Sequence, residues 1–223
     1  MIDAVIFDFD GVVVDSEPVH LACFRAVLAR RGIPLTDEDY YGRYIGFDDH
    51  DCFAAVLRDS GRDADEALIA AMTAEKTAAV QAAFAESIEP LPGALALMRA
   101  ARAAGAAVGV CSGALRAEIE LAARTVGALD LIDVLVAARD VARGKPDPEG
   151  YLLTMRRLGE KGGRPIDPAA TWVIEDAPAG IDAAKAAGCR VLAVTNSYAP
   201  DALAAADRVA DRLDDVTLAD LDD

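Results

Sequence analysis

The segment that decides the fold lies at the start of the chain, where residues 4–17 read AVIFDFDGVVVDSE. An uninterrupted apolar run, residues 4–7, leads directly into Asp8 and Asp10. Continuous apolar runs without alternating polar positions are typical of parallel strands that are buried on both faces. We therefore expect a buried strand that ends in two carboxylates.

Further apolar runs follow, and longer stretches rich in Ala, Leu, Arg and Glu separate them. The runs are residues 107–111, 134–137, 172–174 and 190–194. Parallel strands need crossover connections, which helices usually provide. The alternation of short apolar runs with helical stretches predicts an α/β protein with a doubly wound, Rossmann-like parallel sheet.

One long interval, from Ser16 to about Ile88, lacks this alternation. It contains no convincing strand, and its helical patterns lie near 18–31, after Thr36, at 50–60 and at 65–85. The segment EPLPG just beyond it contains two prolines, which cannot continue a helix. We expect a small α-helical cap domain, residues 15–88, inserted into an α/β core domain made of residues 1–14 and 89–223.

The bulk composition restricts the partners of this 223-residue chain, whose formal net charge is -16. Such a charge repels the phosphates of nucleic acids and anionic lipids. No apolar run approaches the roughly 20 residues that cross a bilayer, and the first residues do not resemble a signal peptide. We expect a cytoplasmic protein, a monomer or weak homodimer, that binds neither nucleic acid nor membrane.

The C-terminal stretch is strongly acidic, and we expect it to form a solvated surface or a frayed tail. Its acids are Asp211, Asp214, Asp215, Asp220, Asp222 and Asp223.

We expect a cation to lie close to the two carboxylates after the first strand. Removing ionised groups from water costs several kcal/mol each unless a cation or good hydrogen bonds compensate, and Mg²⁺ prefers oxygen ligands. Open α/β sheets also bind ligands beyond the carboxyl ends of their strands. Asp8 could attack phosphorus and form an aspartyl phosphate, while Asp10 protonates the leaving oxygen and later deprotonates water. The alternative is an aspartate-rich turn without chemistry.

A second segment, residues 109–113, reads GVCSG and follows the second expected strand. The hydroxyl of Ser112, together with backbone N–H groups from Gly113 onward, could hold a phosphoryl oxygen. A serine in this position could equally be the N-cap of a helix and have no catalytic task.

Two more segments continue the pattern. Residues 143–148 read RGKPDP, and the charge of Lys145 could offset the negative charge of a phosphoryl group in the transition state. Residues 173–180 read VIEDAPAG, in which Glu175 and Asp176 follow an apolar run. These two acids could also be favourable charges at a helix N-terminus.

In these four segments the chain resembles the haloacid dehalogenase superfamily, whose phosphatases open with DxDG after the first strand. The resemblance covers roughly residues 1–14 and 89–210, and the insertion is similar to the small α-helical cap of subfamily I. That group includes phosphoglycolate phosphatases, sugar-phosphate phosphatases and β-phosphoglucomutase. The resemblance implies a Mg²⁺-dependent phosphatase that acts on a small phosphorylated metabolite, such as a sugar phosphate.

The resemblance also implies a role for each motif residue. Asp8 would be the nucleophile and Asp10 the acid and base, while Ser112, Gly113 and Lys145 would bind the phosphoryl group. The Mg²⁺ site would be formed by Asp8, Asp10, Glu175 and Asp176. Asp10 would contribute its backbone carbonyl and Asp176 its carboxylate, whereas Glu175 would bind the metal directly or hold a coordinated water.

Family caps close over the core, exclude water and contact the part of the substrate that does not react. We expect specificity to depend on cap residues such as His20, Arg43 and His50, with Tyr44 and Lys76 as further candidates. Each of them could instead be a solvated surface residue or a packing residue.

The nearest alternative activity is that of a phosphomutase. The β-phosphoglucomutases use a basic residue in the cap after a glycine, where this chain reads GFDDH at residues 46–50. Hydrolysis is therefore preferred. Dehalogenation is disfavoured because the dehalogenases lack the counterpart of Asp10, and a phospho-acceptor signalling module would need no helical cap.

Overall fold

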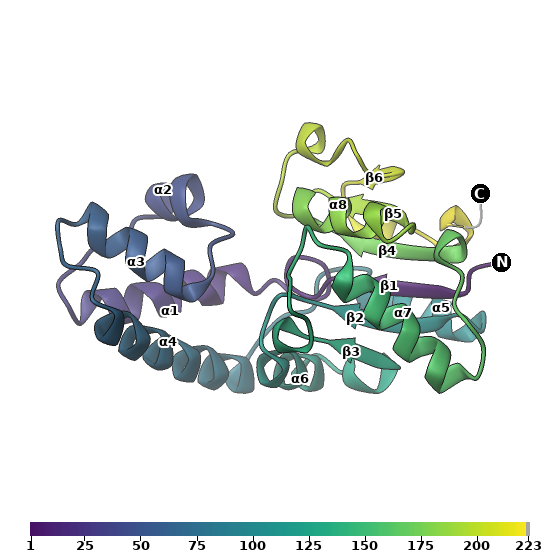
Figure 1. Ribbon diagram of the computed structural model, residues 1–223, viewed down its shortest axis with the longest axis horizontal. Coiled ribbons are helices and arrows are strands. Elements are labelled where there is room, and N and C mark those ends of the chain that lie inside the picture. The colour runs from purple at the N-terminus through teal and green to yellow at the C-terminus, as the bar shows by residue number, and fades with distance from the viewer. Residues whose placement is uncertain (222–223) are drawn as a thin grey trace. The chain divides into compact units, whose positions relative to one another are not determined.

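The core of the protein is a parallel sheet, as predicted. The computed structural model describes residues 1–221, and within them six strands form one sheet in the order β3-β2-β1-β4-β5-β6 (Figure 1). The strands are β1 (Ala4–Phe7), β2 (Ala107–Cys111), β3 (Val134–Val136), β4 (Thr171–Glu175), β5 (Arg190–Val194) and β6 (Arg208–Ala210). This is the order of a doubly wound sheet, in which all strands are parallel. From β1 the chain first adds strands on one side, β2 and β3, and then on the other, β4 to β6. Such folds bind ligands where the order switches, between β1 and β4.

Helices of the core unit cover both faces of the sheet. They are α5 (Ala94–Ala103), α6 (Arg116–Thr125), α7 (Glu149–Gly162) and α8 (Pro178–Ala186). The helices α7 and α8 pack in one hydrophobic cluster with strand residues such as Ile6 and Val173, and α5 packs against β1 and β2 (Figure 1). All four residues of β1 are fully buried, which explains their uninterrupted apolar character.

The C-terminal segment is anchored to the core through residue 221. Leu213 and Leu221 are 2% and 0% exposed, and the backbone carbonyl of Leu221 accepts a 2.6 Å hydrogen bond from Nε1 of Trp172, itself 1% exposed. Of the two alternatives expected for this stretch, the solvated surface is confirmed, since Asp211, Asp214, Asp215 and Asp220 are exposed. The frayed tail is wrong, because leucines placed between these acids reach the core. Asp222 and Asp223 lie outside the described residues.

The chain divides into two compact units, one comprising Met1–Asp15 and the chain from Ser87 onward, the other comprising Ser16–Glu86. Residues 16–86 are all described and contain helices only. These are α1 (Glu17–Ala29), α2 (Asp37–Asp39) with a π-helical turn at Tyr40–Tyr44, α3 (Asp49–Asp59) and α4 (Glu66–Glu86). The helical unit, called the cap unit below, has its own core around Leu28, Phe53 and Met72.

The two connections between the units pair with each other. Val14 and Pro90 form an antiparallel bridge, and the N–H of Leu91 donates to the carbonyl of Val13 at 2.9 Å. Pro90 therefore lies in extended backbone and Pro92 in the turn before the next helix, in keeping with the inability of proline to continue a helix. None of the helices within residues 1–221 is long and apolar enough to span a membrane.

Candidate active site

Strands β1 and β4 bring three carboxylates together at the carboxyl edge of the sheet. Phe7 pairs with Ile174 in register, and the N–H of Asp8 donates to the carbonyl of Ile174 at 2.9 Å. Asp8 therefore lies beside the end of β4, where Glu175 and Asp176 follow. One oxygen from each of these three residues lies within 4.8 Å of the others. They meet at the reversal point of the strand order, where a doubly wound sheet binds its ligand.

Lys145 connects the two strand ends. It lies in the turn before α7, and its Nζ contacts Oδ1 of Asp8 at 2.7 Å and Oε1 of Glu175 at 2.6 Å. Burial disfavours the charged amine, but Asp8 and Glu175 outweigh it and raise the pKa of Lys145 well above its ordinary value. The residue therefore stays a cation that holds both carboxylates.

Glu175 accepts hydrogen bonds at both of its carboxylate oxygens. Oε1 accepts a hydrogen bond of 2.6 Å from the hydroxyl of the fully buried Tyr151, in addition to that from Lys145. Oε2 accepts from the N–H groups of Asp176 at 3.1 Å and Ala177 at 3.3 Å. These four donors fix the orientation of Glu175 and, through it, that of Lys145. Tyr151 was not predicted from the sequence, because a tyrosine on the apolar face of a helix looks like a packing residue.

A glycine of α8 makes room for this carboxylate. An added Cβ at Gly180 would lie 1.8 Å from Oε1 of Glu175. We expect Gly180→Ala to lower the free energy of unfolding by about 1–3 kcal/mol, the usual cost of overpacking, and to reduce activity because Lys145 loses its fixed partner. Urea titration followed by circular dichroism measures the first effect.

The matched control for this substitution is Gly162→Ala in α7. A Cβ at Gly162 meets no atom within 4 Å, so this variant should be at least as stable as the parent protein. Equal free energies of unfolding for the two variants would show that Glu175 moves aside without cost, and would contradict the prediction.

Asp10 and Ser112 lie on the same side of the site. The hydroxyl of Ser112 lies 3.3 Å from Oδ2 of Asp10, to which it donates, and accepts a 3.0 Å hydrogen bond from the N–H of Ala114. Ser112 therefore connects β2 to the loop after β1. Gly113 is exposed, and no atom lies within 4 Å of the position that its Cβ would take.

The donor set fits a divalent cation. Asp8, Glu175 and Asp176 form one cluster of carboxylates, Asp10 is an electrostatic neighbour of Asp8 and Asp176, and Lys145 bridges Asp8 and Glu175. Burial and the neighbouring Glu175 raise the pKa of Asp176 to about 7. Burial also raises the pKa of Asp8 well above its usual range, against the effect of Lys145. Carboxylates that resist ionisation in the absence of metal are the ones that a hard cation such as Mg²⁺ would stabilise.

Two residues in the loop after β5 were not predicted from the sequence either. Asn196 Nδ2 donates to the carbonyl of Gly11 at 2.7 Å, and the hydroxyl of Ser197 donates to Oδ2 of Asp176. The signal that could have found them is their position, since this loop follows the fifth apolar run and so ends at the same edge of the sheet.

The five cap candidates all have partners within the cap unit, and the hydroxyl of Tyr44 donates to Oδ2 of Asp59 at 2.6 Å. Nδ1 of His20 lies 2.7 Å from Nζ of the buried Lys76. Arg43 is half-exposed and pairs with Asp59, whereas His50 lies 3.0 Å from Glu66. His50 also belongs to an exposed acidic group with Asp48 and Asp51, in which Asp48 acts as the N-cap of α3.

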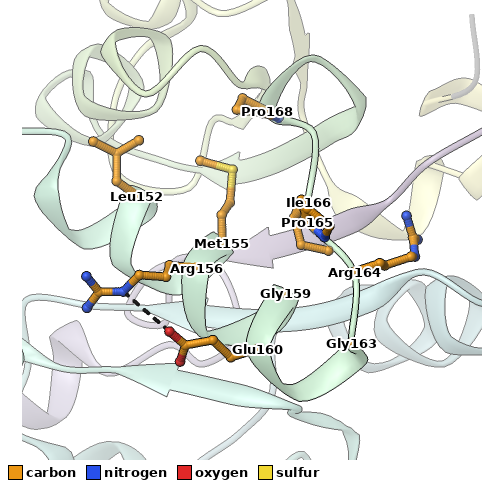
Figure 2. Close-up of a pocket in the computed structure, with 10 residues that line it drawn as sticks. All are labelled: Leu152, Met155, Arg156, Gly159, Glu160, Gly163, Arg164, Pro165, Ile166 and Pro168. Atoms are coloured by element: carbon orange, nitrogen blue, oxygen red, sulfur yellow. Dashed lines mark ion pairs between the residues drawn. The ribbon is translucent and has the colours of Figure 1, made fainter.

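A surface pocket of about 510 Å³ lies elsewhere in the core unit, between α7 and the loop that follows it (Figure 2). Its walls include Leu152, Met155 and Ile166, and Arg156 and Glu160 at its edge form a 3.9 Å ion pair (Figure 2). None of the candidate site residues lines it, so this pocket is separate from the carboxylate cluster at the carboxyl edge of the sheet.

Two curated proteins that resemble this chain over most of its length are phosphatases by name. The chain is 34% identical over 93% of its length, and 92% of the relative's, to validoxylamine A 7'-phosphate phosphatase of Streptomyces hygroscopicus subsp. limoneus. It is 34% identical to the fructose-1-phosphate phosphatase YqaB of Escherichia coli, over 82% of this chain and 92% of that one. The chain is therefore a phosphoric monoester hydrolase.

The family follows from two further comparisons. The sequence model of the haloacid dehalogenase-like hydrolase family matches residues 2–188, so the chain belongs to this family. The crystal structure of CbbY from Rhodobacter sphaeroides in complex with phosphate superposes with a TM-score of 0.87 and 29% identity, covering 100% of both chains. The fold expected from the sequence is thereby confirmed.

Proposed function

We propose that this protein is a Mg²⁺-dependent phosphatase that hydrolyses a small phosphorylated metabolite through an aspartyl phosphate on Asp8. One observation carries the proposal above all: Lys145 holds Oδ1 of Asp8 and Oε1 of Glu175 at 2.7 and 2.6 Å, beside Asp176. This arrangement positions a nucleophile, a fixed positive charge and oxygen ligands for a metal at one point. A helix-capping or surface role would not require a partly buried lysine between two carboxylates.

In the first step, an oxygen of Asp8 attacks phosphorus, and the bond between phosphorus and the leaving oxygen breaks. Asp10 donates its proton to that oxygen, so that an alcohol leaves instead of an alkoxide. Lys145 and the hydroxyl of Ser112 can bind the phosphoryl oxygens whose charge increases in the transition state.

In the second step, a water molecule attacks the phosphorus of the aspartyl phosphate. Asp10, now ionised, removes a proton from this water, and Asp8 and inorganic phosphate are released. Mg²⁺ would be held by Asp8, by the backbone carbonyl of Asp10 and by Asp176, and Glu175 would bind it directly or through a water molecule. The ion would supply positive charge that lets an anionic carboxylate approach an anionic ester. Because both oxygens of Glu175 already accept hydrogen bonds, the water-mediated role suits it better.

The substrate class that we propose is a sugar phosphate or a similar polyhydroxylated phosphate. The names of both curated relatives refer to the phosphate of a sugar or a sugar-like compound. The cap candidates His20, His50, Tyr44 and Arg43 carry imidazole, hydroxyl and guanidinium groups, which can form hydrogen bonds with hydroxyl groups of a substrate.

A phosphomutase is the alternative, and one feature of the cap unit speaks against it. A mutase must hold a second phosphate, which needs a cation with free donors. Lys76 is the buried cation of the cap unit, 2% exposed, and it is bonded to the carboxylate of Asp49 and to His20. Its ammonium group also lies 4.3 Å from the centroid of the Phe24 ring. The Asp49 carboxylate neutralises the charge that a second phosphate would require.

The experiment that tests the proposal is a phosphate-release screen over phosphorylated metabolites and p-nitrophenyl phosphate, with Mg²⁺ or with EDTA. Inclusion of glucose 1-phosphate with catalytic glucose 1,6-bisphosphate separates the two candidates. Release of inorganic phosphate supports the phosphatase, whereas formation of glucose 6-phosphate without phosphate release would identify a mutase.

Metal removal gives a prediction that does not depend on the substrate. At about 100 times its dissociation constant, Mg²⁺ is expected to stabilise the fold by about 2.7 kcal/mol and to raise Tm by roughly 5–10 °C. EDTA should reverse the shift and abolish phosphate release. Calorimetry in KCl of equal ionic strength is the control, because salt screens the repulsion within a chain of net charge -16. Full activity in EDTA would contradict the prediction.

A further inference from the structure

The loop after β5 contacts two segments of the candidate active site. The hydroxyl of Ser197 donates to Oδ2 of Asp176, the residue proposed as a direct metal ligand. Its neighbour Asn196 donates from Nδ2 to the carbonyl of Gly11 at 2.7 Å. Gly11 directly follows Asp10, so the loop touches the polypeptide on both sides of the proposed metal site.

These contacts are made where backbone and carboxylate approach closely. Gly11 has a φ of 75°, and an added Cβ would lie 2.0 Å from Oδ2 of Asp176 and 2.9 Å from the hydroxyl oxygen of Ser197. Asp176 is only 4% exposed, so few water molecules can satisfy its oxygens. The Ser197 hydroxyl therefore occupies one lone pair of Oδ2 and fixes the carboxylate in one orientation.

We propose that Ser197 and Asn196 are positioning residues for the divalent cation. Ser197 holds the Asp176 carboxylate, and Asn196 holds the peptide that joins Gly11 to the following residue and so fixes the turn after Asp10. Groups that orient metal ligands typically contribute 10- to 100-fold to metal affinity. This inference rests on the Mg²⁺ site of the proposed function, and it concerns affinity for the metal and not the chemical step.

The test is Mn²⁺ binding to the whole protein, because Mn²⁺ replaces Mg²⁺ at oxygen sites and its free form is measured by electron paramagnetic resonance. For Ser197→Ala we expect a dissociation constant about 10- to 100-fold higher than that of the parent. The activity of this variant should be restored by raising Mg²⁺, with kcat near that of the parent. Ser197→Thr, which keeps the hydroxyl, should bind Mn²⁺ like the parent.

The matched control is Thr195→Ala in the same loop. The hydroxyl of Thr195 lies 3.4 Å from Asp211 and not at Asp176, so its removal should leave Mn²⁺ affinity unchanged. If Thr195→Ala weakened Mn²⁺ binding as much as Ser197→Ala does, the effect would belong to the loop in general, and the inference would be overturned. An unchanged dissociation constant in Ser197→Ala would overturn it as well, because water would then replace the hydroxyl without loss.

Two further outcomes keep the inference separate from its premises. If Ser197→Ala fails to fold, Asn196→Ala takes its place, since it removes only the contact with Gly11, and parent-like Mn²⁺ binding there overturns the proposal. If the parent protein binds no Mn²⁺ at all, the metal-dependent function itself fails. If the parent binds Mn²⁺ and hydrolyses phosphate esters while the variants bind equally well, only the role of the loop is refuted.

Discussion

Asp8→Asn is expected to lower kcat for p-nitrophenyl phosphate by roughly 10⁴-fold or more, the usual loss when a nucleophile is removed. Asparagine has nearly the same shape but no negative charge, so it cannot attack phosphorus. Lys145 keeps its second partner, Glu175, at 2.6 Å, and the site should therefore remain assembled. Turnover at saturating Mg²⁺ is the measurement.

Stability distinguishes loss of the nucleophile from loss of the fold. Burial and neighbouring acids raise the pKa of Asp8 in the folded protein, so its ionised form destabilises the metal-free protein near neutral pH. Because Asp8→Asn removes this charge, the Tm of the variant in EDTA should equal or exceed that of the parent protein in EDTA. Asp201→Asn, at an exposed position, is the control and should keep full activity. Substantial turnover by Asp8→Asn would refute the assignment of the nucleophile.

The second large effect is expected for Asp10→Asn. Its kcat should fall by roughly 10²- to 10⁴-fold, because the group that transfers protons is missing. The loss should depend on the leaving group. The alkoxide of a sugar is a poor leaving group and must be protonated as it leaves, whereas p-nitrophenolate leaves without protonation. We therefore expect a larger loss with sugar phosphates than with p-nitrophenyl phosphate in single-turnover experiments.

The same variant should accumulate the phosphorylated enzyme. With p-nitrophenyl phosphate, attack by Asp8 proceeds, but the following hydrolysis lacks its base. A burst of p-nitrophenol equal to the enzyme concentration, followed by slow turnover, is the expected time course. Equal losses for both leaving groups and no burst would show that Asp10 does not transfer protons, and that its hydrogen bond with Ser112 serves only the fold.

The sheet was largely predictable because buried parallel strands leave continuous apolar runs. The five strands β1 to β5 were found this way, whereas β6 was missed. Arg208–Ala210 is only three residues long, lies at the edge of the sheet and has a half-exposed valine at its centre, so it carries no apolar run. The helix expected after Thr36 is short and continues as a π-helical turn, an irregularity that periodicity does not encode.

The meeting of the four motif segments followed from topology, because the carboxyl ends of parallel strands share one edge of the sheet. What the sequence could not supply was the set of contacts around them. The hydroxyl of Tyr151 reaches Glu175 from a helix, and the hydroxyl of Ser197 reaches Asp176 from a loop without any recognisable motif. Such contacts depend on side-chain directions, which neither composition nor spacing determines.

Trp172 gives the protein a built-in optical reporter. It is the only tryptophan, and it lies within β4, hydrogen-bonded to the carbonyl of Leu221. Its emission therefore responds to the sheet and the C-terminal segment, while three of the five tyrosines, Tyr40, Tyr41 and Tyr44, belong to the helical unit. Excitation at wavelengths selective for indole should follow melting of the sheet alone, and the combined aromatic signal should add that of the helices. One untagged sample can thus show whether the two units unfold together or in sequence.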